Sequence, residues 1–151
     1  RAPHPIHQPP ATLVLDLLPT PEPDTPAKEP PVSTLKEHLR PFLDIDGVKV
    51  AVLVDWDGFV IDGATRDGAL GTEALGAVIT TVLGSTQVIG REMNVGRAEL
   101  AMLEYERGSV LFRVLGQSGI LAVLLENQSS LGLLRFTIRK RAAELEAALG
   151  A

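Results

Sequence analysis

The sequence predicts an α+β domain in which an antiparallel sheet of five strands lies between helical layers. Two groups of hairpin-linked strand patterns, separated by one long helical pattern, predict the element order α-β-β-α-β-β-β-α. Several strand patterns are apolar on both faces, so both faces of the sheet need cover. All eleven prolines lie in residues 3–41 and all fourteen glycines in residues 47–150, which separates an N-terminal segment from the domain.

Composition excludes several classes of protein. The 151 residues suit one domain with an appendage. Because the chain has no cysteine, it has no disulfide framework, thiolate zinc site or thiol nucleophile. Its formal charge of −5 argues against a general nucleic-acid binder. The sequence has neither a secretory signal pattern nor an apolar run long enough for a bilayer, so we expect a cytoplasmic protein that binds no nucleic acid and no membrane.

Residues 1–32 are expected to form a Pro-rich extended tail or linker, and residues 33–151 the domain. The tail contains ten of the eleven prolines, which lack the N–H that helices and central strands need. Its apolar segment Thr12–Leu18 is either part of a solvated linker or a peptide that adds to a sheet edge or sits in a groove. His4 and His7 have no nearby acid or cysteine, so we interpret them as incidental and not as metal ligands.

The first elements of the domain are a short helix and a hairpin. Ser33 is expected to cap a helix over Thr34–Leu39 that Pro41 ends. The valine-rich segment Val48–Asp55 is apolar on both faces, which is typical of a covered strand. Asp57-Gly58 is a turn signal, and Phe59–Asp62 is the returning strand.

A long helix is expected to begin at Thr72. Its apolar positions follow helical spacing: Leu75, Val78, Ile79, Val82, Leu83, Thr86, Ile89 and Met93. Beside them runs a small-residue stripe of Gly76, Thr80 and Gly84, flanked by Ala77 and Thr81. Each interior glycine costs about 1 kcal/mol relative to alanine, so the stripe predicts a close backbone approach. The approaching partner is either the chain's own sheet or the same helix of a second subunit, and the second alternative makes these five residues a candidate dimer interface.

Three more strands and a last helix complete the domain. The strands are expected at Glu99–Glu106, Ser109–Leu115 and Ile120–Glu126. Ser129 or Ser130 is expected to cap the last helix, which Gly150 ends. The predicted inner stripe of that helix is Leu131, Leu134, Ile138, Ala142, Leu145 and Leu149.

Three segments within this order resemble the Roadblock/LC7 domain family, in its bacterial MglB-like branch. They are VLVDWDGFVI at residues 52–61, LEYERG at 103–108 and NQSSLGLLR at 127–135. The similarity covers about residues 33–149. It implies a profilin-like α/β/α sandwich with a five-stranded antiparallel sheet.

The resemblance also implies a function without catalysis. Roadblock/LC7 domains form homodimers, and they regulate or scaffold Ras-like small GTPases in signalling or serve as light chains in larger assemblies. The MglB-like branch stimulates hydrolysis by repositioning the GTPase's own residues. The resemblance therefore implies a homodimer and a small-GTPase partner, with no catalytic residue, no cofactor and no metal.

Charged and aromatic residues indicate candidate partner surfaces. Aspartates gather near the first hairpin and basic residues in the last helix, a pattern that also suits ordinary solvated faces. Arg135 and Arg139 lie one turn apart and share a face. Trp56, beside Asp57 in the hairpin turn, is either an interface anchor or folded back on the core. We take Trp56, Asp57, Arg135 and Arg139 as the candidate partner interface.

Two other functions remain open. One is a dimerising assembly or sensory module of a larger signalling protein without a GTPase partner, which the Pro-rich leader and the start at Arg1 favour. A more remote one is a haloacid-dehalogenase-type phosphatase, with Asp55 as nucleophile and Asp57 as general acid/base. Such an enzyme needs a further metal-binding acid and alternating βαβ units, whereas this chain has no Asp after Asp67. A calcium loop at the same turn is disfavoured, because glycine falls at its fourth position and not its sixth.

Overall fold

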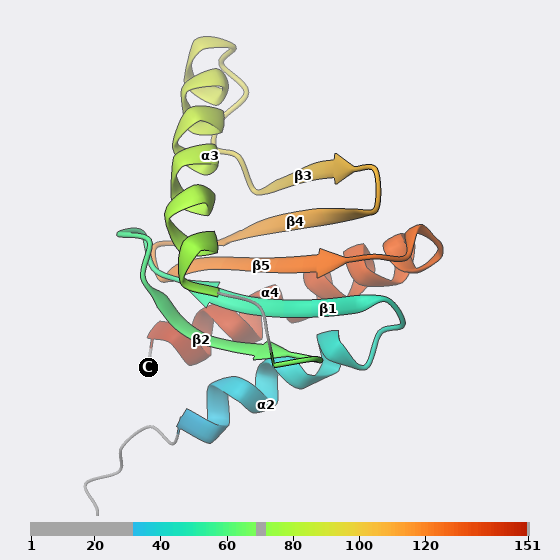
Figure 1. Cartoon of the computed structure of the whole chain (residues 1–151). Coiled ribbons are helices and arrows are strands. Elements are labelled where there is room, and N and C mark those ends of the chain that lie inside the picture. Colours follow the sequence, from blue (N-terminus) through green and yellow to red (C-terminus); the bar gives the residue numbers. More distant parts are fainter. Residues whose placement is uncertain (1–31, 69–71, 151) are drawn as a thin grey trace, which may run out of the picture. The chain divides into compact units, whose positions relative to one another are not determined.

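A five-stranded antiparallel sheet with helices on both faces forms the part of the protein that the structure describes (Figure 1). The computed structural model describes residues 32–68 and 72–150. Its elements are α2 (Val32–Leu43), β1 (Val48–Val54), β2 (Val60–Thr65), α3 (Thr72–Glu92), β3 (Leu100–Tyr105), β4 (Gly108–Leu115), β5 (Gly119–Leu125), the 3₁₀ turn η1 (Gln128–Ser130) and α4 (Leu131–Gly150). The predicted fold and element order are confirmed. The predictions for the Pro-rich tail, including Thr12–Leu18, His4 and His7, lie outside the described residues.

The strand order is β2-β1-β5-β4-β3, and every neighbouring pair is antiparallel. β2 and β3 are therefore the two edges of the sheet. Successive side chains of a strand point to opposite faces, so the sheet supports two separate cores. Ala51 and Leu53 of β1 pack toward α2 and α4, whereas Val50, Val52 and Val54 pack toward Ile79 and Leu83 of α3. The expectation that strands apolar on both faces are covered on both faces is confirmed for β1.

The first helix is longer than predicted. α2 runs over Val32–Leu43, so Ser33 lies inside it and Pro41 does not end it. Proline deprives the helix of one backbone hydrogen bond, to the carbonyl four residues earlier. The burial of Leu39 and Phe42, both fully excluded from solvent, outweighs that loss. Tertiary packing therefore overrides the local stop signal.

α3 covers only part of its face of the sheet. Its buried residues are Gly76, Ile79, Leu83 and Gly90. The helix crosses the strands and its C-terminal half extends past the β3 edge (Figure 1). By length and composition α3 is the one described helix that would be able to cross a membrane. Its apolar character has a simpler origin here, because one side packs on the sheet and a second side borders an open apolar groove.

The start of the last helix also differs from the prediction. Asn127 is the N-cap of the turn η1, which leads directly into α4, so Ser129 and Ser130 lie inside that turn. The Asn127 Oδ1 atom accepts hydrogen bonds from Ser129 N at 3.0 Å and from Ser129 Oγ at 2.7 Å. Its Nδ2 donates to Asp46 Oδ2 at 3.1 Å, which ties the loop before β1 to the start of α4. The predicted inner stripe of α4 is confirmed by the burial of Leu134, Ile138, Ala142 and Leu145.

Asn127→Ala is expected to lower the free energy of unfolding by about 1–2 kcal/mol, because it removes the cap and the link to Asp46. Urea unfolding followed by circular dichroism measures the change. Ser129→Ala is the matched control. It keeps the backbone N–H that donates a hydrogen bond to the Asn127 side chain, and it loses only the hydroxyl group. Equal effects of the two substitutions would contradict the capping role.

Candidate protein-interaction surfaces

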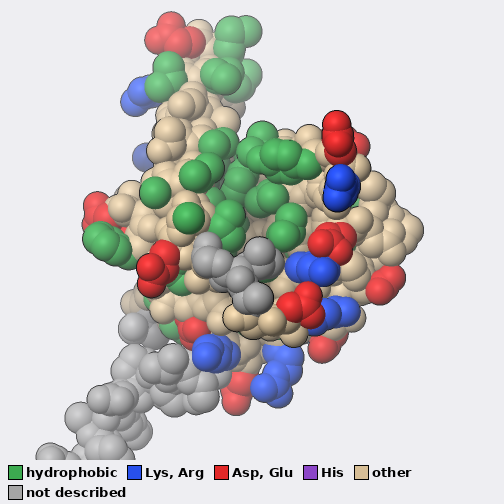
Figure 2. Space-filling view, viewed as in Figure 1, with side chains coloured by type: hydrophobic (Ala, Val, Ile, Leu, Met, Phe, Trp, Pro, Cys, Tyr) green, Lys and Arg blue, Asp and Glu red, His purple; other side chains and the backbone are tan. Residues whose placement is uncertain are grey.

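An apolar groove opens beside α3, on the part of the sheet that this helix leaves uncovered. It has a volume of about 510 Å³, and its lining includes Val50, Val52, Leu75, Val78, Tyr105 and Leu124. Figure 2 shows hydrophobic side chains gathered in this hollow between α3 and the strands. Large contiguous apolar patches on a protein surface mark ligand grooves or interaction sites.

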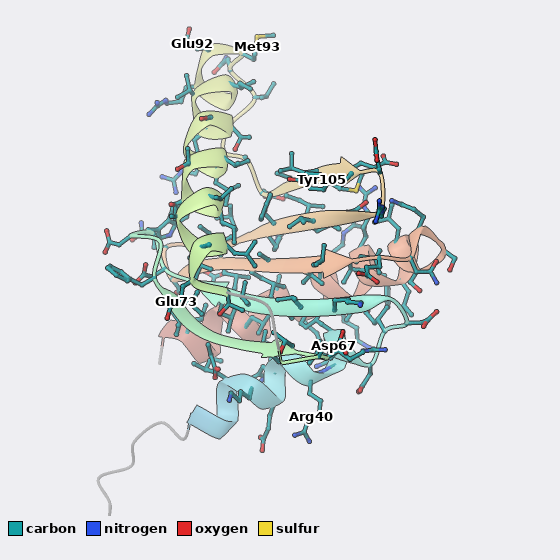
Figure 3. All side chains as sticks on the ribbon, viewed as in Figure 1. Arg40, Asp67, Glu73, Glu92, Met93 and Tyr105 are labelled. Atoms are coloured by element: carbon teal, nitrogen blue, oxygen red, sulfur yellow. The ribbon has the colours of Figure 1, made fainter. Side chains whose placement is uncertain are left out.

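The flank of α3 that borders this groove is also apolar. Val78, Ile89 and Met93 are 56%, 60% and 68% exposed. At 100° per residue these three positions fall on one flank of the helix. Figure 3 shows Met93 at the projecting end of α3 and Tyr105 at the β3 edge. A continuous apolar surface thus runs from the projecting helix end into the groove.

The β3 edge completes this surface. β3 pairs with β4 on one side, and the strand order gives it no other neighbour among the described residues. Met102 and Tyr105 of this strand are exposed. An edge strand presents unpaired N–H and C=O groups that another strand pairs with readily.

An ion cluster lies at one end of the apolar groove. The Lys49 Nζ atom is 3.3 Å from Asp67 Oδ2 and 3.3 Å from Glu126 Oε2. The hydrogen bond to Asp67, followed by that to Glu126, raises the pKa of Lys49 above its usual value. Lys49 thereby links the segment after β2 to the end of β5.

The small-residue stripe is divided between two environments. A β-carbon at Gly76 would overlap the carbonyl oxygen of Gly58 in the hairpin turn, and Thr80 also faces Gly58. Gly84 has no atom within 4 Å of the position of a β-carbon, and Ala77 and Thr81 are exposed. For Gly76, the close approach that the stripe predicted is therefore made by the chain's own hairpin. The stripe follows the flank of α3 away from the apolar groove.

The candidate partner residues fall on two different layers. Trp56 is 41% exposed, and Asp57 beside it is exposed, in the hairpin turn that packs against α3. Arg135 and Arg139 are exposed positions of α4, which packs on the opposite face of the sheet. The structure therefore does not bring these four residues into one patch.

The side chain of Asp55 stabilises the hairpin turn. Its Oδ1 atom accepts hydrogen bonds from the backbone N–H groups of Asp57 and Phe59, both at 2.9 Å. The turn predicted at Asp57-Gly58 is present, with Gly58 at a φ of +91°.

The sheet is antiparallel throughout, unlike the βαβ arrangement that the phosphatase alternative requires. Within residues 32–68 and 72–150, no three His, Cys, Asp or Glu side chains are grouped to hold a metal ion.

A second hollow, the polar cleft, lies on the other flank of α3. It has a volume of about 800 Å³, and its lining includes Trp56, Gln87, Arg91, Asn94, Arg97 and Gln117. Sequence reasoning identified Trp56 but missed both arginines. No local pattern marks them, because the cleft is formed by the end of α3, the following loop, the β1–β2 turn and the β4–β5 turn.

Comparisons with known proteins agree with the fold. The family model for the Roadblock/LC7 domain matches residues 34–125. The uncharacterized protein MJ1340 of Methanocaldococcus jannaschii is 32% identical over 102 residues, which cover 68% of this chain and 88% of that protein.

Solved structures of MglB are similar in fold. MglB of Myxococcus xanthus superposes with a TM-score of 0.71 at 22% identity, covering 78% of this chain and 96% of that one. The gliding protein MglB of Thermus thermophilus gives a TM-score of 0.70 at 20% identity, covering 80% of this chain and 91% of its own. Because the family model matches more than half of the residues of this chain, the chain belongs to the Roadblock/LC7 domain family.

Proposed function

We propose that this protein is a homodimeric regulator or scaffold of a Ras-like small GTPase in a bacterial cytoplasm. The observation that carries the proposal is the apolar groove beside α3, which lies next to an unpaired strand edge in a Roadblock/LC7 domain. Its MglB-like fold supports a regulatory role. The protein is proposed to act by binding, with no cofactor and no chemistry of its own.

The second copy is proposed to fill the groove with its own α3. Pairing β3 with the β3 of a second copy would continue the sheet across a two-fold axis. Because the C-terminal half of α3 extends past the β3 edge, each helix end would then reach over the partner's sheet (Figure 1). Ile89 and Met93 would enter the partner's groove, where they meet the apolar side chains of its strands. The same contact covers both apolar surfaces at once.

In this proposal the small-residue stripe is not the primary dimer contact. Gly76 and Thr80 already face the hairpin of their own chain. Ala77, Thr81 and Gly84 remain exposed, on a part of α3 turned away from the groove. The primary dimer contact is therefore proposed for the Ile89 and Met93 flank, and a Gly84 variant separates the two possibilities.

The GTPase proposal is tested with each Ras-like small GTPase encoded in the genome of origin. We expect one of them to bind the purified protein at least about tenfold more tightly in one nucleotide state, which corresponds to about 1.4 kcal/mol. Isothermal titration calorimetry with GDP-loaded and GTP-analogue-loaded GTPase measures this difference. Single-turnover GTP hydrolysis, with and without the protein, separates an activating regulator from a scaffold.

Absence of binding in both nucleotide states for every such GTPase would contradict the proposal. A chain that still dimerised under those conditions would fit the assembly-module alternative. The GTPase partner and the dimer are therefore tested separately.

A further inference from the structure

We propose that the polar cleft binds an acidic segment of a protein partner, through Arg91 and Arg97 with Trp56 as its aromatic wall. The cleft lies on the flank of α3 away from the apolar groove. The proposal does not depend on the partner being a GTPase.

The loop after α3 is held in a fixed position that presents Arg97 beside the helix end. The Gln87 side chain pairs with the backbone of Ala98 twice, accepting from its N at 3.2 Å and donating to its O at 3.4 Å. Val95 N donates to Gly90 O at 3.0 Å. The carbonyl of Gly96 packs directly on Gly90, where a β-carbon would overlap it. These contacts preorganise the cleft before any partner arrives.

The charges in the cleft are available to a ligand. Arg91 and Arg97 are exposed, and within the described ranges neither forms an ion pair. By contrast, Arg113 pairs with Glu99 and Arg141 with Glu144. A guanidinium presents five N–H donors in a planar fork that matches a carboxylate. The cleft therefore holds two unengaged cations suited to acidic side chains.

The shape of the cleft favours a peptide segment over a small molecule. Small-molecule sites are mostly apolar and bury most of their ligand. This cleft is open, and its lining includes amide groups from Asn94 and Gln117 beside the two arginines. Trp and Arg are among the side chains enriched in the energetic centres of protein interfaces. An extended acidic segment would pair with both arginines and pack against Trp56.

The adjacent carboxylates set a limit on this attraction. Asp55 is already engaged by two backbone N–H groups of its turn. Asp57 is exposed next to Trp56, so its charge opposes an acidic ligand at that end of the cleft. Asp57→Asn is therefore expected to tighten binding of an acidic peptide, in the direction opposite to the arginine substitutions.

The chain's single tryptophan makes the test direct, because Trp56 lines the cleft. The full-length protein is titrated at low ionic strength with an acetylated octaglutamate peptide, and the intrinsic fluorescence is recorded. We expect a saturable change whose midpoint rises about threefold for Arg91→Gln or Arg97→Gln and about tenfold for the double variant, as for exposed ion pairs. Higher salt should weaken the binding of the peptide. Arg107→Gln, an equal charge change on the groove side of α3, is the matched control.

Three outcomes would overturn the proposal. They are the absence of a saturable fluorescence change, an equal loss of affinity with Arg107→Gln, and tighter binding of inorganic pyrophosphate than of the peptide. The last outcome would identify a site for a small anion. Because the measurement uses neither a GTPase nor the oligomeric state, its failure leaves the proposed function untouched.

Discussion

Gly76→Ala is expected to lower the free energy of unfolding by about 2 kcal/mol, although alanine is the better helix former. A β-carbon at position 76 would overlap the carbonyl oxygen of Gly58 and would also contact Val54 Cγ1 at 3.5 Å. The hairpin turn would have to move away from α3, and the contacts of both elements with the core would loosen. Urea unfolding of the purified variant measures the change.

Gly84→Ala is the matched control, and its effect has the opposite sign. This glycine is exposed on the same helix, with no atom within 4 Å of the position of a β-carbon. Alanine there is expected to raise the free energy of unfolding by about 1 kcal/mol, through helix propensity alone. Both measurements need several protein concentrations, because the proposed dimerisation would add to the apparent stability. If Gly76→Ala also stabilised the protein, the packing of the hairpin on α3 would be wrong.

Gly76 and Gly84 show which part of the packing of α3 can be predicted from the sequence. Their spacing with Thr80 predicts that a backbone comes close to one face of the helix. The sequence does not say which backbone, because Gly58 lies eighteen residues before Gly76 and the hairpin reaches the helix only through the fold. Local pattern therefore predicts that space is needed, and tertiary structure decides what occupies it.

The elements themselves were more predictable than their ends. Strands such as β1 and β5 are apolar on both faces, so their burial follows from residue type alone. The helix ends depended on competition between local signals and packing. α2 continues past Pro41, where Phe42 is buried in the core. Asn127 has the capping role expected of a serine, and its side-chain amide donates a hydrogen bond to Asp46. Contacts between residues that lie far apart in the sequence cannot be predicted from a short segment of it.

The interaction surfaces were the least predictable part. Val50 and Val52 look like ordinary core residues, and they line an open groove only because α3 crosses the strands and continues past the edge of the sheet. Arg91 and Arg97 belong to no motif in the sequence, and the fold places them in the polar cleft with Trp56. The angle at which α3 crosses the strands and the packing of the loop after it determine these two surfaces. Neither the angle nor the loop packing can be predicted from residue periodicity.

Ile89→Glu is expected to weaken the proposed dimer by more than about a hundredfold. The side chain is 60% exposed in the single chain and would be buried in the partner's groove. Placing a carboxylate there without a partner would cost at least about 3 kcal/mol, counted over both copies of a two-fold dimer. The single chain should still fold, because the position is exposed and glutamate is a good helix former. Light scattering and sedimentation equilibrium measure the dissociation.

Gly84→Leu is the matched variant on the other side of α3. Leucine has open space there in the single chain, so a loss of dimer would mean that a second copy approaches the small-residue face at Ala77, Thr81 and Gly84. We expect Gly84→Leu to leave the dimer intact and Ile89→Glu to dissociate it. The reverse result would move the contact from the apolar groove to the stripe. If neither substitution changed the oligomer, the pairing of two copies through β3 and α3 would be wrong, since no arrangement that places the projecting helix end in the partner's groove tolerates a charge at Ile89.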